Sequence, residues 1–146
     1  MVDISSKPIS YREAKASGRI NLKPKTIERI RNNLIEKGDP LQISILAGIN
    51  SSKLTHILLP LCHPLKIENT NIEAKIQKSY VEIISTVKGI DKSGVEMEAL
   101  TSTAIALLNI WDITKQYEKT NDGQYPTTSI SHIKVIKKIK RKIDSS

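Results

Sequence analysis

The longest apolar helical pattern of the chain lies in KSGVEMEALTSTAIALLNIWDITK, residues 92–115. Ser93-Gly94 predicts a turn, and acidic residues just after it favour the positive end of a helix dipole. Apolar residues then recur at three- and four-residue spacing: Leu100, Ala104, Leu107, Leu108 and Trp111. This spacing predicts a core-facing helix that begins near Glu96.

Charged residues lie near both ends of this predicted helix, with Glu96 and Glu98 at its start and Asp112 and Lys115 near its end. Glu98 and Asp112 are fourteen positions apart, which is about 21 Å along a continuous helix. They cannot both contact one small reacting atom, so either the ligand is long or a second copy of the chain completes each site. A structural alternative, which the pattern alone favours, is that the glutamates support the helix start and Asp112–Lys115 is a surface ion pair.

Length and composition predict a single domain, residues 1–146, with a basic tail at 137–146. The only cysteine, Cys62, excludes an internal disulfide and is typical of a reducing cytoplasm. The apolar runs are too short to cross a bilayer, and the first residues do not resemble a signal peptide. We therefore expect a cytoplasmic protein with no membrane partner.

The net charge of +8 indicates an anionic partner. Nucleic acid and a phosphorylated small molecule both satisfy this. The chain has no Phe, one Trp and four Tyr, so a base-stacking surface would have few rings. The aromatic content therefore favours the small molecule over single-stranded RNA.

The remaining patterns predict the order of elements. Ser10 to Glu13 has capping-box form, which predicts a short helix closed by Gly18. The other expected elements are a strand at 19–22, helices at 26–36 and about 41–57, strands at 65–77 and 79–88, the helix described above, and a strand at 128–135. This order predicts an α+β protein with a ferredoxin-like split βαβ antiparallel sheet and extra N-terminal helices.

The helix expected at about 41–57 has one apolar side. That side carries Ile43, Leu46, Ala47, Asn50, Leu54 and Ile57. Their spacing predicts the face that packs on the core.

Cys62 and His63 are neighbours between Pro60 and Pro64, so this segment cannot be regular helix. Such a pair can hold a nucleophile, a proton donor or a ligand. A metal site is not expected, because no second cysteine exists and the other histidines show no ligand spacing. The structural alternative is a buried thiol and a hydrogen-bonded histidine in a rigid loop.

Several blocks together resemble the MoaC family, the cyclic pyranopterin monophosphate synthases of molybdenum cofactor biosynthesis. In chain order they are MVDIS at 1–5, REA at 12–14, KGD at 37–39, AGI at 47–49, LPLCHPL at 59–65, GVEMEALT at 94–101 and Asp112-x-x-Lys115. The resemblance implies a lyase that converts a cyclised dihydroguanosine triphosphate into cyclic pyranopterin monophosphate and releases pyrophosphate. It also implies a ferredoxin-like subunit in a homohexamer, a trimer of dimers with sites at dimer interfaces, and no cofactor.

The resemblance also implies roles for individual residues. Asp112, Lys115 and Lys37 match catalytic positions. Substrate-binding positions are matched by Leu61, Cys62, His63, Glu96, Met97, Glu98, Arg12 and Lys53. We expect Asp112 to transfer protons and the basic residues to neutralise phosphates. We expect Glu98 to be an anion that accepts hydrogen bonds from the base ring.

The chain departs from the family pattern at its C-terminal end. The family's KSGGKSG motif is replaced by KIKRK at 138–142, and without glycine the backbone cannot freely adopt positive φ. Lys142 is therefore a weaker candidate for a phosphate ligand than Lys115. Ile45 and Leu54 stand where many members have Arg, and Trp111 where Tyr is usual, which we expect to alter packing more than chemistry.

Two other functions remain open from the sequence. A basic ferredoxin-like module could bind RNA through its sheet and Lys-rich tail, although the aromatic shortage and the acidic residues argue against nucleic acid. A degenerate, inactive family member is the other alternative, because of the altered tail.

Overall fold

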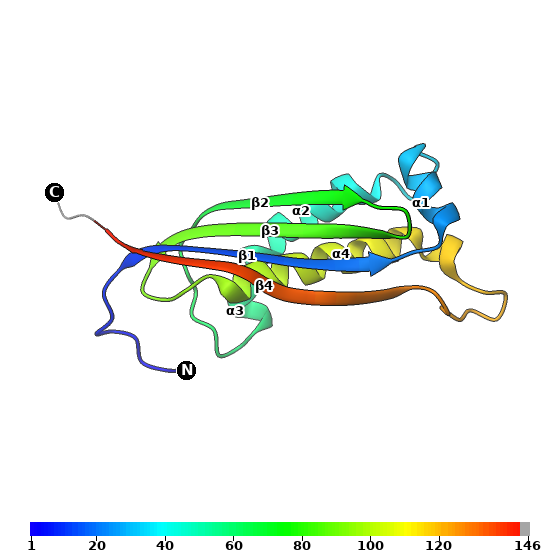
Figure 1. Cartoon of the computed structure of the whole chain (residues 1–146). Helices are drawn as coiled ribbons and strands as arrows, with labels where there is room; N and C mark the ends of the chain where they lie inside the picture. Colours follow the sequence, from blue (N-terminus) through cyan, green and yellow to red (C-terminus); the bar gives the residue numbers. More distant parts are fainter. Residues whose placement is uncertain (144–146) are drawn as a thin grey trace.

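The computed structural model describes residues 1–143, in which four strands form one open antiparallel sheet in the order β2-β3-β1-β4. The elements are β1 (Ser10–Asn21), α1 (Pro24–Arg31), α2 (Pro40–Ser52), α3 (Thr55–Leu58), β2 (Ile67–Ile76), β3 (Tyr80–Asp91), α4 (Glu96–Glu118) and β4 (Ser129–Lys142). The long helices α2 and α4 run behind the sheet along one of its faces (Figure 1). The α+β class is confirmed, and so are the strands predicted at 65–77 and 79–88, which correspond to β2 and β3.

β1 contradicts the prediction of a short helix at its start. It is a continuous strand between β3 and β4, in which Ala14 is opposite Val87 on one side and Lys138 on the other. Alternate side chains from Ser10 onward are buried, as in a strand with one covered face. The capping-box pattern is a local signal, and hydrogen bonding to two neighbouring strands overrides it.

Helix α4 begins at Glu96 as predicted, but its buried stripe is rotated from the predicted one. The buried side chains include Ala99, Ser102, Thr103, Ala106, Leu107, Ile110, Ile113 and Thr114. Leu108 is 52% exposed, and Leu100 and Trp111 are only partly covered. Small residues face inward where α4 lies very close to α2. Ser102 Oγ donates to the Gly48 carbonyl at 2.9 Å, and a Cβ at Gly48 would lie only 3.2 Å from the Ser102 carbonyl oxygen and Oγ.

The segment predicted as one helix at 41–57 is two helices, and its predicted core face is wrong. Asp39 caps α2 by accepting from the Leu41 and Gln42 amides, and α2 ends at Ser52 before the short α3. Ser44, Gly48, Ser51 and Ser52 face inward. The larger apolar side chains Ile43, Leu46, Leu54 and Ile57 are exposed.

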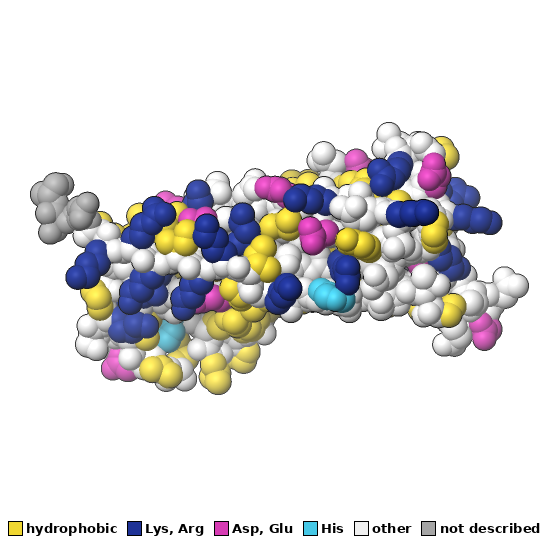
Figure 2. Space-filling model, viewed as in Figure 1, with side chains coloured by type: hydrophobic (Ala, Val, Ile, Leu, Met, Phe, Trp, Pro, Cys, Tyr) yellow, Lys and Arg dark blue, Asp and Glu magenta, His cyan; other side chains and the backbone are white. Residues whose placement is uncertain are grey.

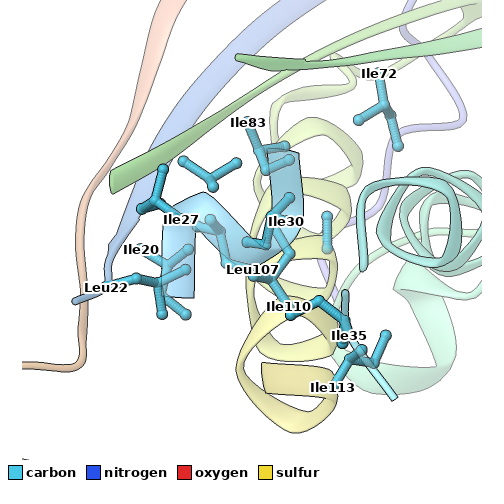
Figure 3. Packing of buried hydrophobic residues seen from close by; sticks show 12 residues of the cluster. Ile20, Leu22, Ile27, Ile30, Ile35, Ile72, Ile83, Leu107, Ile110 and Ile113 are labelled. Carbon is cyan, nitrogen blue, oxygen red and sulfur yellow. The ribbon is translucent and has the colours of Figure 1, made fainter. Parts of the chain in front are cut away.

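The main hydrophobic core fills the space between the sheet and helices α1 and α4. Ile27 and Ile30 of α1 pack with Leu107 and Ile110 of α4 and with Ile83 of β3 (Figure 3). This packing holds the C-terminal half of α4 against the sheet, and a second cluster that includes Ala99 and Val87 holds its start. No helix within residues 1–143 is both long and apolar enough to span a membrane.

The predicted basic tail is in large part strand. β4 continues to Lys142, paired with β1 as far as Ser10, with irregularities between Lys15 and Ala16 and near His132, whose φ is 61°. The sequence predicts a tail from 137 because residues 137–142 are Lys and Arg except for Ile139, which gives no strand alternation. Residues 144–146 of this tail lie outside the described part. Figure 2 shows the resulting gathering of Lys and Arg side chains at the end of the sheet near the C-terminus.

Glu118, in the last turn of α4, is a fully buried carboxylate that joins three elements. It accepts from the Lys23 amide at 3.1 and 3.3 Å, from the Thr26 hydroxyl, and from the Thr128 hydroxyl at 2.7 Å. The start of α1 and the segment before β4 are therefore both held on α4.

We predict that Glu118→Ala lowers the free energy of unfolding by about 3 kcal/mol, because buried donors lose their acceptor and a cavity remains. Glu28→Ala is the control, since Glu28 is exposed on α1 and forms no ion pair among residues 1–143. Urea denaturation of both variants measures the difference. Equal, small losses would show that Glu118 does not hold these elements together.

Candidate active site

Asp112 lies near the C-terminal end of α4 between two lysines. Lys37 Nζ donates to Asp112 Oδ2 at 2.6 Å, and Lys115 Nζ donates to Asp112 Oδ1 at 3.0 Å. All three side chains are about half exposed. The structure therefore brings together the three residues predicted to be catalytic.

The two lysines keep Asp112 ionised. The hydrogen bond from Lys37, and then that from Lys115, lower the pKa of Asp112 below its ordinary value. Asp112 in turn raises the pKa of Lys115. The cluster thus presents a carboxylate that can accept a proton and ammonium groups that can meet phosphate.

The elements bring these groups together from distant parts of the sequence. Asp112 and Lys115 are one helical turn apart on α4, so they are neighbours by helix geometry. Lys37 comes from the connection between α1 and α2, where Gly38 has φ of 134°. An open hollow of about 390 Å³ adjoins Asp112 and Lys115, with Leu108, Trp111 and Ile130 as its other walls.

A second cluster lies at the other end of α4. A cavity of about 320 Å³ is lined by the N-terminal arm, the Leu61–Leu65 segment and the start of α4: Val2, Ile4, Lys7, Leu61, Cys62, His63, Leu65, Ser93, Gly94, Glu96, Met97 and Glu98. Six of the residues predicted to bind substrate therefore share one cavity. The irregular backbone predicted for the Cys62–His63 segment is confirmed.

Glu98 differs electrically from the expectation of an anion. Glu98 is only 3% exposed, and this burial is the main reason that the pKa of its carboxyl is raised to about 7. The nearby negative charge of Glu96 contributes a smaller part of this rise. The helix dipole favours the charged form at this position, but loss of water outweighs it. The carboxyl can therefore be neutral or ionised near neutral pH.

Glu96 stays ionised beside a lysine that is not among the predicted site residues. Lys138 Nζ of β4 lies 2.5 Å from Glu96 Oε1. Burial raises the pKa of Glu96, but the hydrogen bond from Lys138, a backbone hydrogen bond and the charges of Lys138 and Arg12 together outweigh burial and leave the pKa lowered. The position of Lys138 follows from the register of β4 on β1, which no local motif reveals.

Arg12 and Lys53 lie outside the cavity that contains Glu98. Arg12 is 5% exposed; its Nη2 donates to the Lys92 carbonyl at 3.4 Å, and its buried Nε has no partner within the described structure. Lys53 lines a neighbouring hollow, which shares Leu65 with the cavity. Their roles as phosphate contacts remain predictions.

The two clusters are far apart within one chain. Because α4 is continuous from Glu96 to Glu118, the fourteen positions between Glu98 and Asp112 correspond to about 21 Å. Within residues 1–143, no group of three or more His, Cys, Asp or Glu side chains is placed to hold a metal ion. The architecture is that of an α+β protein with a carboxylate at each end of one buried helix.

Comparison with known proteins identifies the family of this chain. Residues 1–140 match the MoaC family. The chain is 53% identical over 140 residues to a probable cyclic pyranopterin monophosphate synthase of Sulfolobus acidocaldarius, covering 96% of this chain and 98% of the relative. Proteins with the same name are similar in Saccharolobus solfataricus (53% over 142 residues; 97% and 95% covered) and Pyrococcus furiosus (47% over 140 residues; 96% and 90% covered). The chain belongs to the MoaC family.

We predict that Glu98 makes the stability of the fold depend on pH. A carboxyl whose pKa rises from 4.5 to about 7 on folding is protonated in the native state and ionised in the unfolded state between these values. The free energy of unfolding therefore falls as pH rises from about 5 to 7, by up to about 3 kcal/mol.

Urea denaturation across this pH range measures the effect. Glu98→Gln, which cannot ionise, is expected to lose the fall, whereas the exposed-site control Glu28→Gln keeps it. A fall of equal size in Glu98→Gln would contradict the raised pKa.

Proposed function

We propose that the chain is a lyase that makes cyclic pyranopterin monophosphate in molybdenum cofactor biosynthesis. Its substrate is (8S)-3',8-cyclo-7,8-dihydroguanosine 5'-triphosphate, and pyrophosphate is the second product. The observation that supports this most directly is the Lys37–Asp112–Lys115 cluster, in a chain whose relatives carry the synthase name. A substrate with three phosphates also accounts for the net charge of +8.

The Asp112 cluster performs the phosphate chemistry in this proposal. Asp112 takes the proton from the substrate hydroxyl that attacks the α-phosphorus, and the bond from that phosphorus to the leaving pyrophosphate breaks. Lys37 and Lys115 neutralise the charge that builds up on the phosphate oxygens. Both lysines are within hydrogen-bonding distance of Asp112, so the proposed base and the two cations lie side by side.

The cavity around Glu98 holds the guanine-derived ring. Leu61 and Met97 supply apolar contact, and Cys62, His63 and Glu98 supply groups for hydrogen bonds. A carboxyl with a pKa of about 7 can either donate to or accept from the ring as its protonation changes. Glu96 and the neighbouring cations Lys138, Arg12 and Lys53 complete the polar surroundings.

Two copies of the chain are needed to complete each site. One substrate molecule must meet both Glu98 and Asp112, which lie about 21 Å apart along α4 in a single copy. Exposed apolar side chains on α2 and α3, including Leu46 (65%) and Ile57 (66%), supply surface for self-association. We propose a homohexamer, a trimer of dimers with its sites at dimer interfaces.

Three further assignments accompany this function. The chain forms one domain, and the β-α-β-β-α-β order with the sheet order β2-β3-β1-β4 supports the ferredoxin-like class. Helices α2 and α4 are then the two helices of that unit, and α1 and α3 are additions. The single Cys62 supports a cytoplasmic location.

We predict that Asp112→Asn lowers turnover by at least about a hundredfold, because the amide cannot take up a proton. The variant should fold normally, since Asp112 is exposed. The assay incubates the protein with the cyclised nucleotide and measures pyrophosphate and the pterin product.

Asp122→Asn is the matched control, because Asp122 is an exposed aspartate in the turn after α4. It should retain full turnover. If Asp112→Asn folds, binds the nucleotide and turns over at the native rate, the proton-transfer role is wrong. If the unmodified protein forms neither product, the proposed function is wrong.

A further inference from the structure

Lys37 needs support beyond its ion pair with Asp112. It lies outside any helix or strand, in the connection from Leu34 to Asp39, and its side chain is about half exposed. Ion pairs at such exposed positions hold side chains only weakly. The backbone on either side must therefore determine whether the ammonium group reaches Asp112.

One side of Lys37 is held by the cap of α2. The Asp39 carboxylate accepts from the Leu41 and Gln42 amides at 3.0 and 3.3 Å, which fixes the start of the helix. The other side is held by Tyr117: the Glu36 amide, directly before Lys37, donates to Tyr117 Oη at 2.9 Å. Tyr117 thus fixes the backbone next to the catalytic lysine from outside its own segment.

The ring of Tyr117 is itself held in place. The guanidinium of Arg29 lies 4.6 Å from the ring centroid, and the Leu34 amide donates to the Arg29 carbonyl at 2.9 Å. Next along α4, buried Glu118 fixes the start of α1 through Lys23 and Thr26. Helix α1 is therefore attached to α4 near both of its ends.

Tyr117 and Asp112 are carried by the same helix. They are five positions apart, which is about 7.5 Å along α4. Because one rigid helix carries both the carboxylate and the acceptor that fixes the Lys37 segment, the distance between them does not depend on a flexible element. The phenol oxygen and the carboxylate together set where Lys37 can lie.

We propose, building on the proposed function, that Tyr117 is a positioning residue for Lys37. Its phenol oxygen fixes the Glu36 amide and so directs the Lys37 ammonium group to Asp112. Within the described structure, Tyr117 forms no hydrogen bond with the Lys37 ammonium group or with the Asp112 carboxylate.

Tyr117→Phe tests this with little change to the fold. The variant keeps the ring and its contact with Arg29, and the exposed Glu36 amide can bond to water instead. We expect a nearly unchanged melting temperature. We expect kcat about tenfold lower with KM little changed, because a misplaced catalytic group slows the reaction more than it weakens binding.

A second readout does not depend on activity. Limited acetylation with acetic anhydride, followed by mass spectrometry, reports how freely each lysine reacts, with the exposed Lys25 as an internal reference. Lys37 should react about threefold faster in Tyr117→Phe, because an amine released from its carboxylate is more available. If the unmodified protein does not turn over the nucleotide, the proposed function fails and the acetylation rate alone decides the role of Tyr117.

Tyr80→Phe is the matched control. Tyr80 also lies against an arginine, with Arg19 at 4.8 Å from its ring, but its hydroxyl makes no hydrogen bond within the described structure. Both readouts should match those of the unmodified protein. In a Lys37→Met background, Tyr117→Phe should cause no further loss of turnover.

Unchanged acetylation of Lys37 in Tyr117→Phe would overturn the proposal, whatever happens to kcat. So would an unchanged kcat in an otherwise active enzyme, or an equal further loss of turnover in the Lys37→Met background.

Discussion

Helix α4 is rigid and continuous, so it sets the distance between the two ends of the candidate site. Its 23 residues run unbroken from Glu96 to Glu118, and both the sheet and α2 pack against its small side chains. Glu98 and Asp112 therefore cannot approach each other by any local movement. In the function proposed above, one substrate molecule therefore meets Glu98 of one copy of the chain and Asp112 of another.

The two ends of α4 hold carboxylates in opposite electrical conditions. Asp112 is exposed between Lys37 and Lys115, and its pKa is lowered. Glu98 is buried beside Glu96, and its pKa is raised to about 7. One end thus carries an anion between two cations, which suits phosphate chemistry. The other end carries a carboxyl that gains or loses a proton near neutrality, which suits recognition of a ring. Differences in burial and in neighbouring charge therefore give two carboxyl groups on one helix opposite pKa shifts.

Much of this could be predicted from the sequence, and the failures have physical causes. The long helix and the strands predicted at 65–77 and 79–88 follow from periodicity, and the grouping of Cys62 and His63 with Glu98 follows from the resemblance to the MoaC family. β1 was wrongly predicted because its pairing with two strands is a long-range property. The buried faces of α2 and α4 were wrongly predicted because close helix packing selects Gly, Ser and Ala, while large apolar residues such as Leu46 face outward. Lys138 could not be found without the register of β4.

Subunit mixing tests the central claim most directly. Asp112→Asn and Glu98→Gln are each expected to inactivate the protein, but through opposite ends of α4. If each site takes Asp112 from one copy and Glu98 from another, unfolding and refolding an equal mixture restores about a quarter of the native turnover, because half of the random pairs are mixed and each has one intact site. A mixture no more active than the sum of its separate variants would contradict sites shared between copies.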